Sequence, residues 1–202
     1  MEDVGGNINN HRTVTALICR RCPLKMCQLH PVKEDKVIQL CVIIKHPKSN
    51  MATTKNSKSI RATAKKLYQA FTEPKALEVW LVPGKMTAKV HNFDLRVGGG
   101  YQMSLFYPPT DKTSQGKTTN KEDRYTSRFL ELIPNKRIVQ AITFDTENPD
   151  FSDEMIMEVT FEEDRSETTV TIVFKNIPSG IRPEDNEEGT KSSLEKLTQY
   201  VE

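Results

Sequence analysis

Hydrophobic and polar residues alternate along much of the chain, and this pattern predicts half-buried strands. The clearest run sets Met155, Met157 and Val159 against Glu154 and Glu158. The same period predicts further strands over residues 85–97, 101–107, 125–133, 137–144 and 170–174. The chain therefore contains six consecutive strands, which we expect to pair antiparallel.

The pattern changes to a helical period at both ends of this strand region. A short strand over 58–62 is followed by Thr63, a residue suited to begin a helix, and Pro74 ends or redirects that helix. A second short helix is expected over 75–81. From about residue 185 onward, Leu194, Leu197 and Val201 recur at helical spacing and predict an amphipathic terminal helix.

These elements predict an α+β fold. One curved antiparallel sheet has an apolar face that needs a cover. Among the predicted helices only the C-terminal one is long enough to supply it. We therefore expect the sheet to wrap around the long C-terminal helix, with two short helices after strand one. A cavity between the sheet and that helix is possible.

The first fifty residues differ from the rest in composition. They contain none of the 14 aromatic residues, and they carry 8 Lys and Arg against 4 Asp and Glu. Because aromatic side chains dominate cores, we expect a domain over 58–202, a linker over 51–57 and an N-terminal extension over 1–50. We interpret the extension as disordered or absent from the mature domain.

The extension holds the only candidate metal ligands, which are Cys19, Cys22, Cys27 and His30. These residue types suit zinc, but structural zinc sites usually join two such pairs through a longer loop. A targeting peptide is a further alternative, although Glu2 and Asp3 are atypical of one. We expect no bound metal and no cofactor.

Four sequence blocks resemble a known superfamily. They are Thr63-Ala-Lys-Lys-Leu-Tyr-Gln-Ala-Phe-Thr-Glu-Pro-Lys-Ala-Leu-Glu-Val-Trp80, Phe93-Asp-Leu-Arg-Val-Gly-Gly-Gly-Tyr101, Leu130-Glu-Leu-Ile-Pro-Asn-Lys-Arg-Ile138 and Glu188-Gly-Thr-Lys-Ser-Ser-Leu-Glu-Lys-Leu197. In this order they resemble the SRPBCC superfamily of START and birch-pollen-allergen proteins. The nearest branch resembles the C-terminal domain of activators of the heat-shock chaperone ATPase. The resemblance implies a helix-grip fold over residues 58–202. Trp80-Leu81 stands where the family often has an aromatic pair, and Thr190 stands where an aromatic residue often follows the helix glycine, so the family's ligands are not carried over.

Catalytic side chains are sparse after residue 50. No cysteine follows Cys41, and His91 is the only histidine there. The alternation places His91 on one face with Phe93, Leu95 and Val97, which makes it the one weak catalytic candidate. A partly solvated histidine is the simpler interpretation, since catalysis needs a positioned partner. The run Gly98–Gly100 precedes a strand, so we interpret it as a hairpin feature.

An apolar set is the better candidate for a ligand site. Its members are Trp80, Phe93, Tyr101, Met103, Phe129, Phe144 and Met157. Each alone is more readily explained as core. Methionines on an inner face add weight, because their side chains adapt to irregular ligands.

Three functions follow as hypotheses. The first is non-catalytic binding of a small hydrophobic molecule. The second, implied by the resemblance, is stimulation of a heat-shock chaperone ATPase in the stress response. Residues 51–90 contain 8 Lys and Arg but only 2 Asp and Glu, and such a basic segment is compatible with docking of an acidic partner protein. The third is a polyketide cyclase or dehydratase with His91 or Tyr101 as proton donor.

Charge and hydropathy exclude other partners. The formal net charge of the chain is +2, which provides no electrostatic case for nucleic acid. No apolar run of about 18 residues is present for a membrane span. We expect a cytoplasmic protein.

Overall fold

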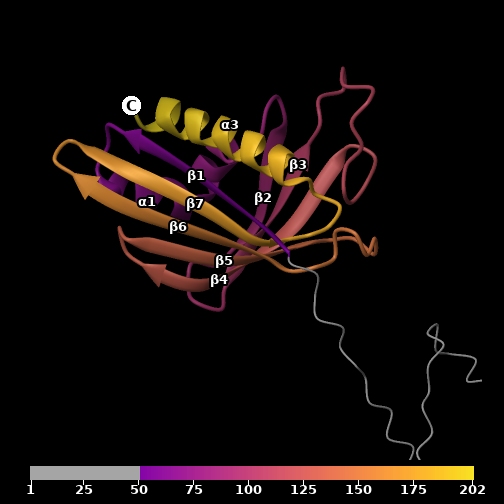
Figure 1. Cartoon of the computed structure of the whole chain (residues 1–202), viewed down its shortest axis with the longest axis horizontal. Helices are drawn as coiled ribbons and strands as arrows, with labels where there is room; N and C mark the ends of the chain where they lie inside the picture. The colour runs from indigo at the N-terminus through magenta and orange to yellow at the C-terminus, as the bar shows by residue number, and fades with distance from the viewer. Residues whose placement is uncertain (1–50) are drawn as a thin grey trace, which may run out of the picture. The chain divides into compact units, whose positions relative to one another are not determined.

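A computed structural model describes residues 51–202 (Figure 1). It contains three helices, α1 (Ala64–Thr72), α2 (Pro74–Trp80) and α3 (Pro183–Val201). Its seven strands are β1 (Ala52–Ile60), β2 (Thr87–Phe93), β3 (Gly100–Phe106), β4 (Glu122–Ile133), β5 (Arg137–Phe144), β6 (Met155–Asp164) and β7 (Glu167–Ile177).

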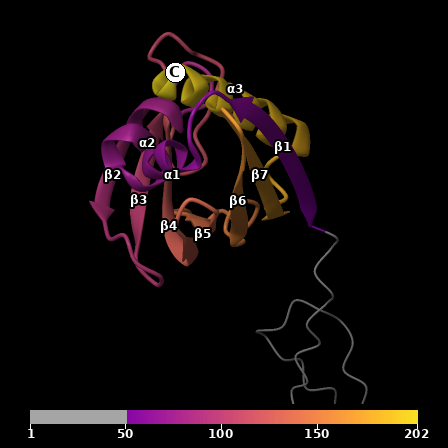
Figure 2. The same ribbon diagram turned by 90° about the vertical axis from the view of Figure 1, so that its left-hand side faces the viewer.

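The seven strands form one antiparallel sheet in the order β1-β7-β6-β5-β4-β3-β2. Viewed from the side, the strands follow an arc, and the helices lie on its concave side (Figure 2). The α+β fold with a curved sheet around the C-terminal helix is therefore confirmed, as are the two short helices after strand one.

The first strand begins earlier than the sequence indicated. Residues 51–57, expected as a linker, mostly belong to β1, which pairs with β7 from Ala52 onward. The pattern concealed this because the inward residues of β1 that precede Ile60 include the polar Thr54, Asn56 and Lys58. The Thr54 hydroxyl donates to Asn186 Oδ1 of α3 at 2.5 Å, and Lys58 forms an ion pair with Glu195 at 2.8 Å.

A bulge interrupts β2, and its side chains therefore do not follow the alternation that the sequence predicted. Asn92 has a positive φ of 42°, and the pairing register with β3 shifts between His91 and Phe93. The strand then ends at Phe93, and Leu95 and Val97 are exposed. A bulge adds one residue and reverses the alternation. The sequence-based prediction of a shared face for His91, Phe93, Leu95 and Val97 is therefore wrong.

The glycine run forms the β2–β3 connection, as expected. Gly98 has a φ of +83°, which favours glycine, and its amide donates to the Phe129 carbonyl at 2.8 Å. A Cβ on Gly100 would lie 1.9 Å from the carbonyl oxygen of Ser127. Gly100 can therefore lie against β4 only because it lacks a side chain, whereas Gly98 is suited to its position by its positive φ.

The helix pair packs one end of the concave face. Thr63 Oγ1 accepts a hydrogen bond from the Lys66 amide at 3.2 Å and begins α1, and Pro74 at the start of α2 separates the two helices. The fully buried rings of Phe71 and Trp80 lie 4.4 Å apart, and Phe71 meets Phe161 of β6 at 5.3 Å. The two helices therefore complete a dense aromatic core.

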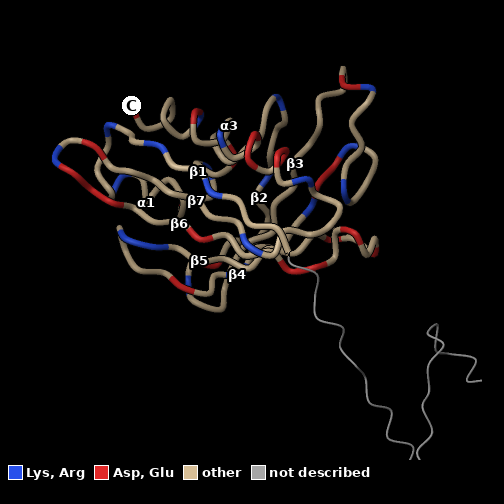
Figure 3. Tube along the Cα trace, viewed as in Figure 1, with Lys and Arg blue, Asp and Glu red and all other residues tan. Residues whose placement is uncertain are grey.

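Acidic side chains occupy the outer surface of β6, as the alternation predicted. Met155, Met157, Val159 and Phe161 are buried, whereas Glu158 points outward and pairs with Arg137 and Lys175. Further acidic residues gather at the β6–β7 turn (Figure 3). None of the helices in residues 51–202 combines the length and apolar character needed to cross a membrane.

Candidate functional site

A cavity of about 990 Å³ lies between the sheet and the N-terminal half of α3. Its apolar wall comes from the inner face of five strands and comprises Tyr101, Leu105, Tyr125, Ile142, Phe144, Met155, Met157, Ile172 and Phe174. These side chains converge because alternate residues of every strand point to the concave face. The volume is at the upper end of the range for small-molecule sites.

The helix side of the cavity is made of small and polar residues. Asn186, Gly189, Thr190 and Ser193 line it, and Thr190 Oγ1 donates to the Asn186 carbonyl at 2.7 Å. One or two turns later, Leu194, Leu197 and Val201 are buried. The space is therefore left open where α3 lacks large side chains.

The connection between α2 and β2 is tied to α3 at the rim. Lys196 Nζ donates to the carbonyls of Val82 at 2.6 Å and Gly84 at 2.7 Å. The Gly84 amide donates to Ser192 Oγ at 3.1 Å. Burial lowers the pKa of Lys196. These bonds hold Pro83 and Gly84 as one wall of the cavity.

A buried polar group lies beneath the apolar wall. Tyr101 OH donates to Gln140 Oε1 at 3.0 Å, and Ser127 Oγ donates to the same oxygen at 2.5 Å. Burial raises the pKa of Tyr101 to about 12. Tyr101 is therefore a neutral hydrogen-bond donor near pH 7, already engaged by the protein, which does not support a role as proton donor.

Three of the seven ligand-binding candidates line the cavity, namely Tyr101, Phe144 and Met157. The other four do not. Trp80 is fully buried at the packed end, and its indole Nε1 donates to the Ala70 carbonyl at 2.9 Å. Met103 and Phe129 are fully buried, and Phe93 stacks on Tyr101 with ring centroids 5.7 Å apart. These four belong to the core around the cavity.

His91 lies on the opposite face of the sheet, away from the cavity. Its Nε2 is 3.1 Å from Ser104 Oγ, and Ser104 donates to Glu122 Oε1 at 2.6 Å. Ser104 is fully buried, which denies a substrate access to its hydroxyl. His91 therefore does not share the inward face of Phe93, because the bulge at Asn92 places these two residues on opposite faces of the sheet.

Metal ligands are not gathered anywhere in residues 51–202, where no group of three or more His, Cys, Asp or Glu is placed to hold an ion. The candidates Cys19, Cys22, Cys27 and His30 lie outside the described residues.

The sequence did not reveal the polar residues of the cavity, among which Tyr107, Lys117 and Asp123 form a cluster. Asp123 is only 2% exposed. A usable signal existed, since Asp123 extends by one step the inner-face alternation of Tyr125, Ser127 and Phe129. A charged residue at an inward position needs a partner. Lys117 comes from the preceding loop, and its position could not be read from any period.

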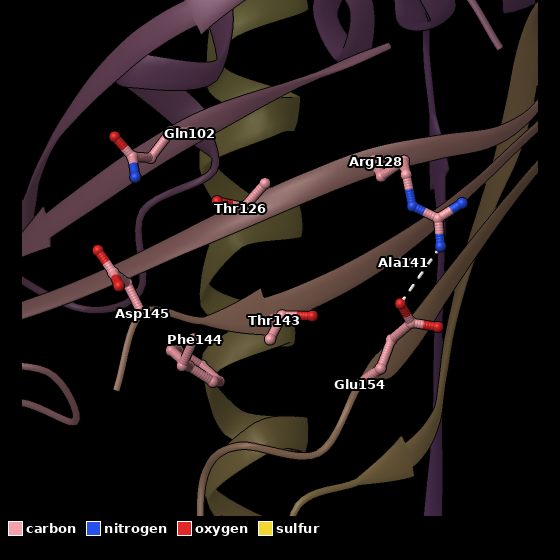
Figure 4. Close-up of a pocket in the computed structure, with 8 residues that line it drawn as sticks. All are labelled: Gln102, Thr126, Arg128, Ala141, Thr143, Phe144, Asp145 and Glu154. Carbon is pink, nitrogen blue, oxygen red and sulfur yellow. Dashed lines mark hydrogen bonds and ion pairs between the residues drawn. The ribbon is translucent and has the colours of Figure 1, made fainter. Parts of the chain in front are cut away.

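A second, smaller pocket of about 360 Å³ lies on the outer face of the sheet (Figure 4). Gln102, Thr126 and Thr143 project from neighbouring strands there, with α3 behind the sheet. Arg128 and Glu154 close one side through an ion pair of 3.3 Å. The side chains that line this smaller pocket are mostly polar. The charges of Arg128 and Glu154 are already paired with each other.

Residues 61–202, more than half of the chain, match the family described as "Activator of Hsp90 ATPase homolog 1-like protein". The chain belongs to this AHSA1-like family. The suspected SRPBCC branch is thereby confirmed. No curated protein matches the chain.

Solved structures agree with membership in the AHSA1-like family. A protein from Chromobacterium violaceum is 30% identical, with a TM-score of 0.66 over 74% of this chain and 96% of that one. A Staphylococcus epidermidis protein is 20% identical, with a TM-score of 0.58 over 77% and 92%. An AHSA1-like protein from Aeromonas hydrophila is 18% identical, with a TM-score of 0.54 over 73% and 92%. The last two show a shared fold alone.

Proposed function

We propose that this chain binds a small hydrophobic molecule in the cavity between the sheet and α3, without catalysing a reaction on it. The observation that supports this proposal is the size of the cavity, about 990 Å³, together with its mainly apolar wall. The most adaptable side chains of this wall are Met155 and Met157, which can fit irregular ligands. In this proposal the protein acts in the cytoplasm.

The position of Trp80 determines how binding should be measured. This sole tryptophan is fully buried against Phe71, away from the cavity, so its emission is a poor reporter of a bound ligand. Phe174 lines the cavity and is partly buried. A Phe174→Trp variant therefore places a reporter at the site, and Thr143→Trp places a matched reporter at the outer pocket.

The test combines these variants with a panel of sterols, flavonoids, fatty alcohols and fatty acids. We expect at least one compound to raise the melting temperature and to shift the emission of Phe174→Trp but not that of Thr143→Trp. The proposal fails if no compound does so, or if the binders report only at Thr143→Trp.

A second candidate, co-chaperone activity, is favoured by the description of the family. The basic residues Lys55 and Lys65 are exposed and could dock an acidic partner. We expect Lys55→Glu combined with Lys65→Glu to abolish stimulation of a purified heat-shock chaperone ATPase, and the exposed Lys136→Glu to preserve it. An unchanged ATPase rate with the unmodified chain in large excess would remove this candidate.

A further inference from the structure

Three hydrogen-bonded polar residues, Tyr107, Lys117 and Asp123, form a cluster at one end of the cavity. The Asp123 carboxylate accepts a hydrogen bond from the Lys117 amide at 2.5 Å and one from the Tyr107 hydroxyl at 3.2 Å. It also forms an ion pair with Lys117 Nζ. All three residues line the cavity. Because Asp123 is 2% exposed, these partners compensate a charge that would otherwise be costly to bury.

Lys117 retains a hydrogen bond to give. An ammonium group has three N–H donors, and one of them is directed to Asp123. The Nζ atom also lies 5.5 Å from the centroid of the Phe144 ring, a favourable cation–π position. Within residues 51–202, no second hydrogen-bond acceptor is bound to Nζ. At least one further N–H donor is therefore available to a molecule in the cavity.

The charges of the cavity determine which acceptor is suitable. Asp123 neutralises Lys117, and the other charged groups that line the space are Lys85 against Asp111, Asp185 and Glu188. Arg182 pairs with Asp185 at 2.8 Å, which leaves one carboxylate in excess. A ligand carboxylate would lose its hydration and enter a region with an excess of negative charge. A neutral carbonyl or hydroxyl oxygen accepts the same hydrogen bond without that cost.

Tyr107 is the second hydrogen-bond partner that holds the Asp123 carboxylate. Burial, followed by the neighbouring Asp123 charge, raises the pKa of Tyr107. Its hydroxyl therefore stays protonated near pH 7 and donates to Asp123. With Tyr107 on one side and the loop amide of Lys117 on the other, the carboxylate has a fixed position from which it orients the ammonium.

We propose that Lys117, oriented by Asp123 and Tyr107, donates a hydrogen bond to a carbonyl or hydroxyl oxygen of a neutral ligand whose apolar body lies along Phe144, Met157 and Phe174. This inference rests on the proposed binding function and adds the chemical class of the ligand. Lys117 acts as a specificity-determining contact, and Asp123 and Tyr107 act as positioning residues.

Three compounds that share the naphthalene ring and differ only in one substituent test the proposed hydrogen bond from Lys117. 2-Acetylnaphthalene has a carbonyl oxygen, 2-ethylnaphthalene has the same outline without oxygen, and 2-naphthoate has a carboxylate. By calorimetry at pH 7 we expect the unmodified chain to bind the ketone about tenfold more tightly than the ethyl compound, the effect of one hydrogen bond. We expect 2-naphthoate to bind more weakly than the ketone.

Two variants assign the preference to Lys117. Lys117→Met combined with Asp123→Asn removes both charges and keeps an acceptor for Tyr107, so the fold is spared an unpaired carboxylate. We expect this variant to bind the ketone and the ethyl compound equally well. Lys85→Met, which removes the other cavity lysine, should retain the preference, and circular dichroism and melting curves check that both variants fold.

The possible results separate the two proposals. If both neutral naphthalenes bind the unmodified chain equally well, or if 2-naphthoate binds most tightly, the inference about Lys117 is wrong and the binding function stands. A tenfold preference that survives in the double variant also overturns it. If neither neutral compound binds, the inference is overturned, and the compound panel with the Phe174→Trp reporter then decides the binding function separately.

Discussion

The two ends of the concave face share the sheet and α3 but differ in packing, and the helix pair α1–α2 fills only one of them. At one end, Phe71 lies between Trp80 and Phe161 with no exposed surface on Phe71 or Trp80. At the other end, Met155 and Met157 of the same strand β6 border an open cavity. Helix α3 follows this division, with large apolar residues toward its C-terminus and small or polar residues toward its N-terminus.

This difference shows how one fold can be both stable and hollow. Close packing at one end supplies burial energy for the whole sheet, so the other end can leave space unfilled. The small side chains on the N-terminal half of α3 and the position of the helix pair at the other end together determine where the space lies.

The largest expected effect comes from making the same substitution at both ends. Phe71→Ala removes a fully buried ring and leaves a closed void, so we expect a loss of about 3–5 kcal/mol in the free energy of unfolding. Phe174→Ala borders an existing space and should cost about 1–2 kcal/mol. Urea denaturation measures both values, and equal losses would contradict the division into a packed and a hollow end.

A charged contact adds to the packed end and makes its stability depend on pH. Glu78 of α2 accepts a hydrogen bond from the Val90 amide at 3.0 Å and pairs with Lys75 at 3.0 Å. First the amide and then the lysine lower the pKa of Glu78 from 4.5 to about 2. The folded state therefore binds this proton less readily than the unfolded state.

The stabilisation by Glu78 is complete above about pH 4.5 and is lost as the pH falls toward 2. We expect Glu78→Gln to lower the free energy of unfolding by about 1.5–3 kcal/mol at pH 6 and to flatten its decline between pH 5 and 3. Denaturation curves at pH 6, 5, 4 and 3 measure this. A variant that declines as steeply as the unmodified chain would rule out Glu78 as the source.

Filling the hollow end should separate stability from binding. Ser193 is buried and lines the cavity from α3. We expect Ser193→Leu to raise the free energy of unfolding by about 1 kcal/mol, since cavity-filling changes are commonly stabilising. The same change should weaken binding of 2-acetylnaphthalene at least tenfold. Lys191→Leu, on the exposed side of α3, is the control and should alter neither quantity by much; a destabilised Ser193→Leu would mean that this space is already filled.

The smallest effect is expected at Gly189, a helical residue at the cavity rim. A Cβ there would lie 3.6 Å from Pro83, an ordinary contact distance. Glycine inside a helix is less stable than alanine by about 0.5–1 kcal/mol. We expect Gly189→Ala to raise the free energy of unfolding by that amount, measured by urea denaturation. A loss of stability would indicate that the rim between Pro83 and α3 is tighter than the geometry implies.

The alternation of β6 and the spacing of Leu194, Leu197 and Val201 were sufficient to predict these elements. The sequence pattern failed to predict the start of β1 and the face of His91, because both depend on contacts with a neighbouring strand or helix. The polar strand β1 is stable because its inward residues meet a polar stretch of α3, as Thr54 does with Asn186. The bulge at Asn92, which puts His91 and Phe93 on opposite faces of the sheet, has no periodic signature in the chain.

The candidate site was predicted only in part, for a related reason. Alternation identifies inward residues such as Tyr101, Phe144 and Met157, but it does not tell a residue beside a cavity from one in a packed core, as Met103 illustrates. That distinction depends on what lies across from each side chain. Lys117 could not be foreseen as the partner of Asp123, because a loop has no period to place it.

The sequence by itself determined the number and order of the strands, the two short helices, the closing helix and the family, because these depend on periods and motifs local to the chain. The tertiary structure alone decided which end of the concave face is hollow, which face carries His91, and that Asp123 and Lys117 meet inside the cavity. These features depend on the volumes of facing side chains and on the pairing register of strands that are distant in the sequence. No local pattern in the chain contains that information.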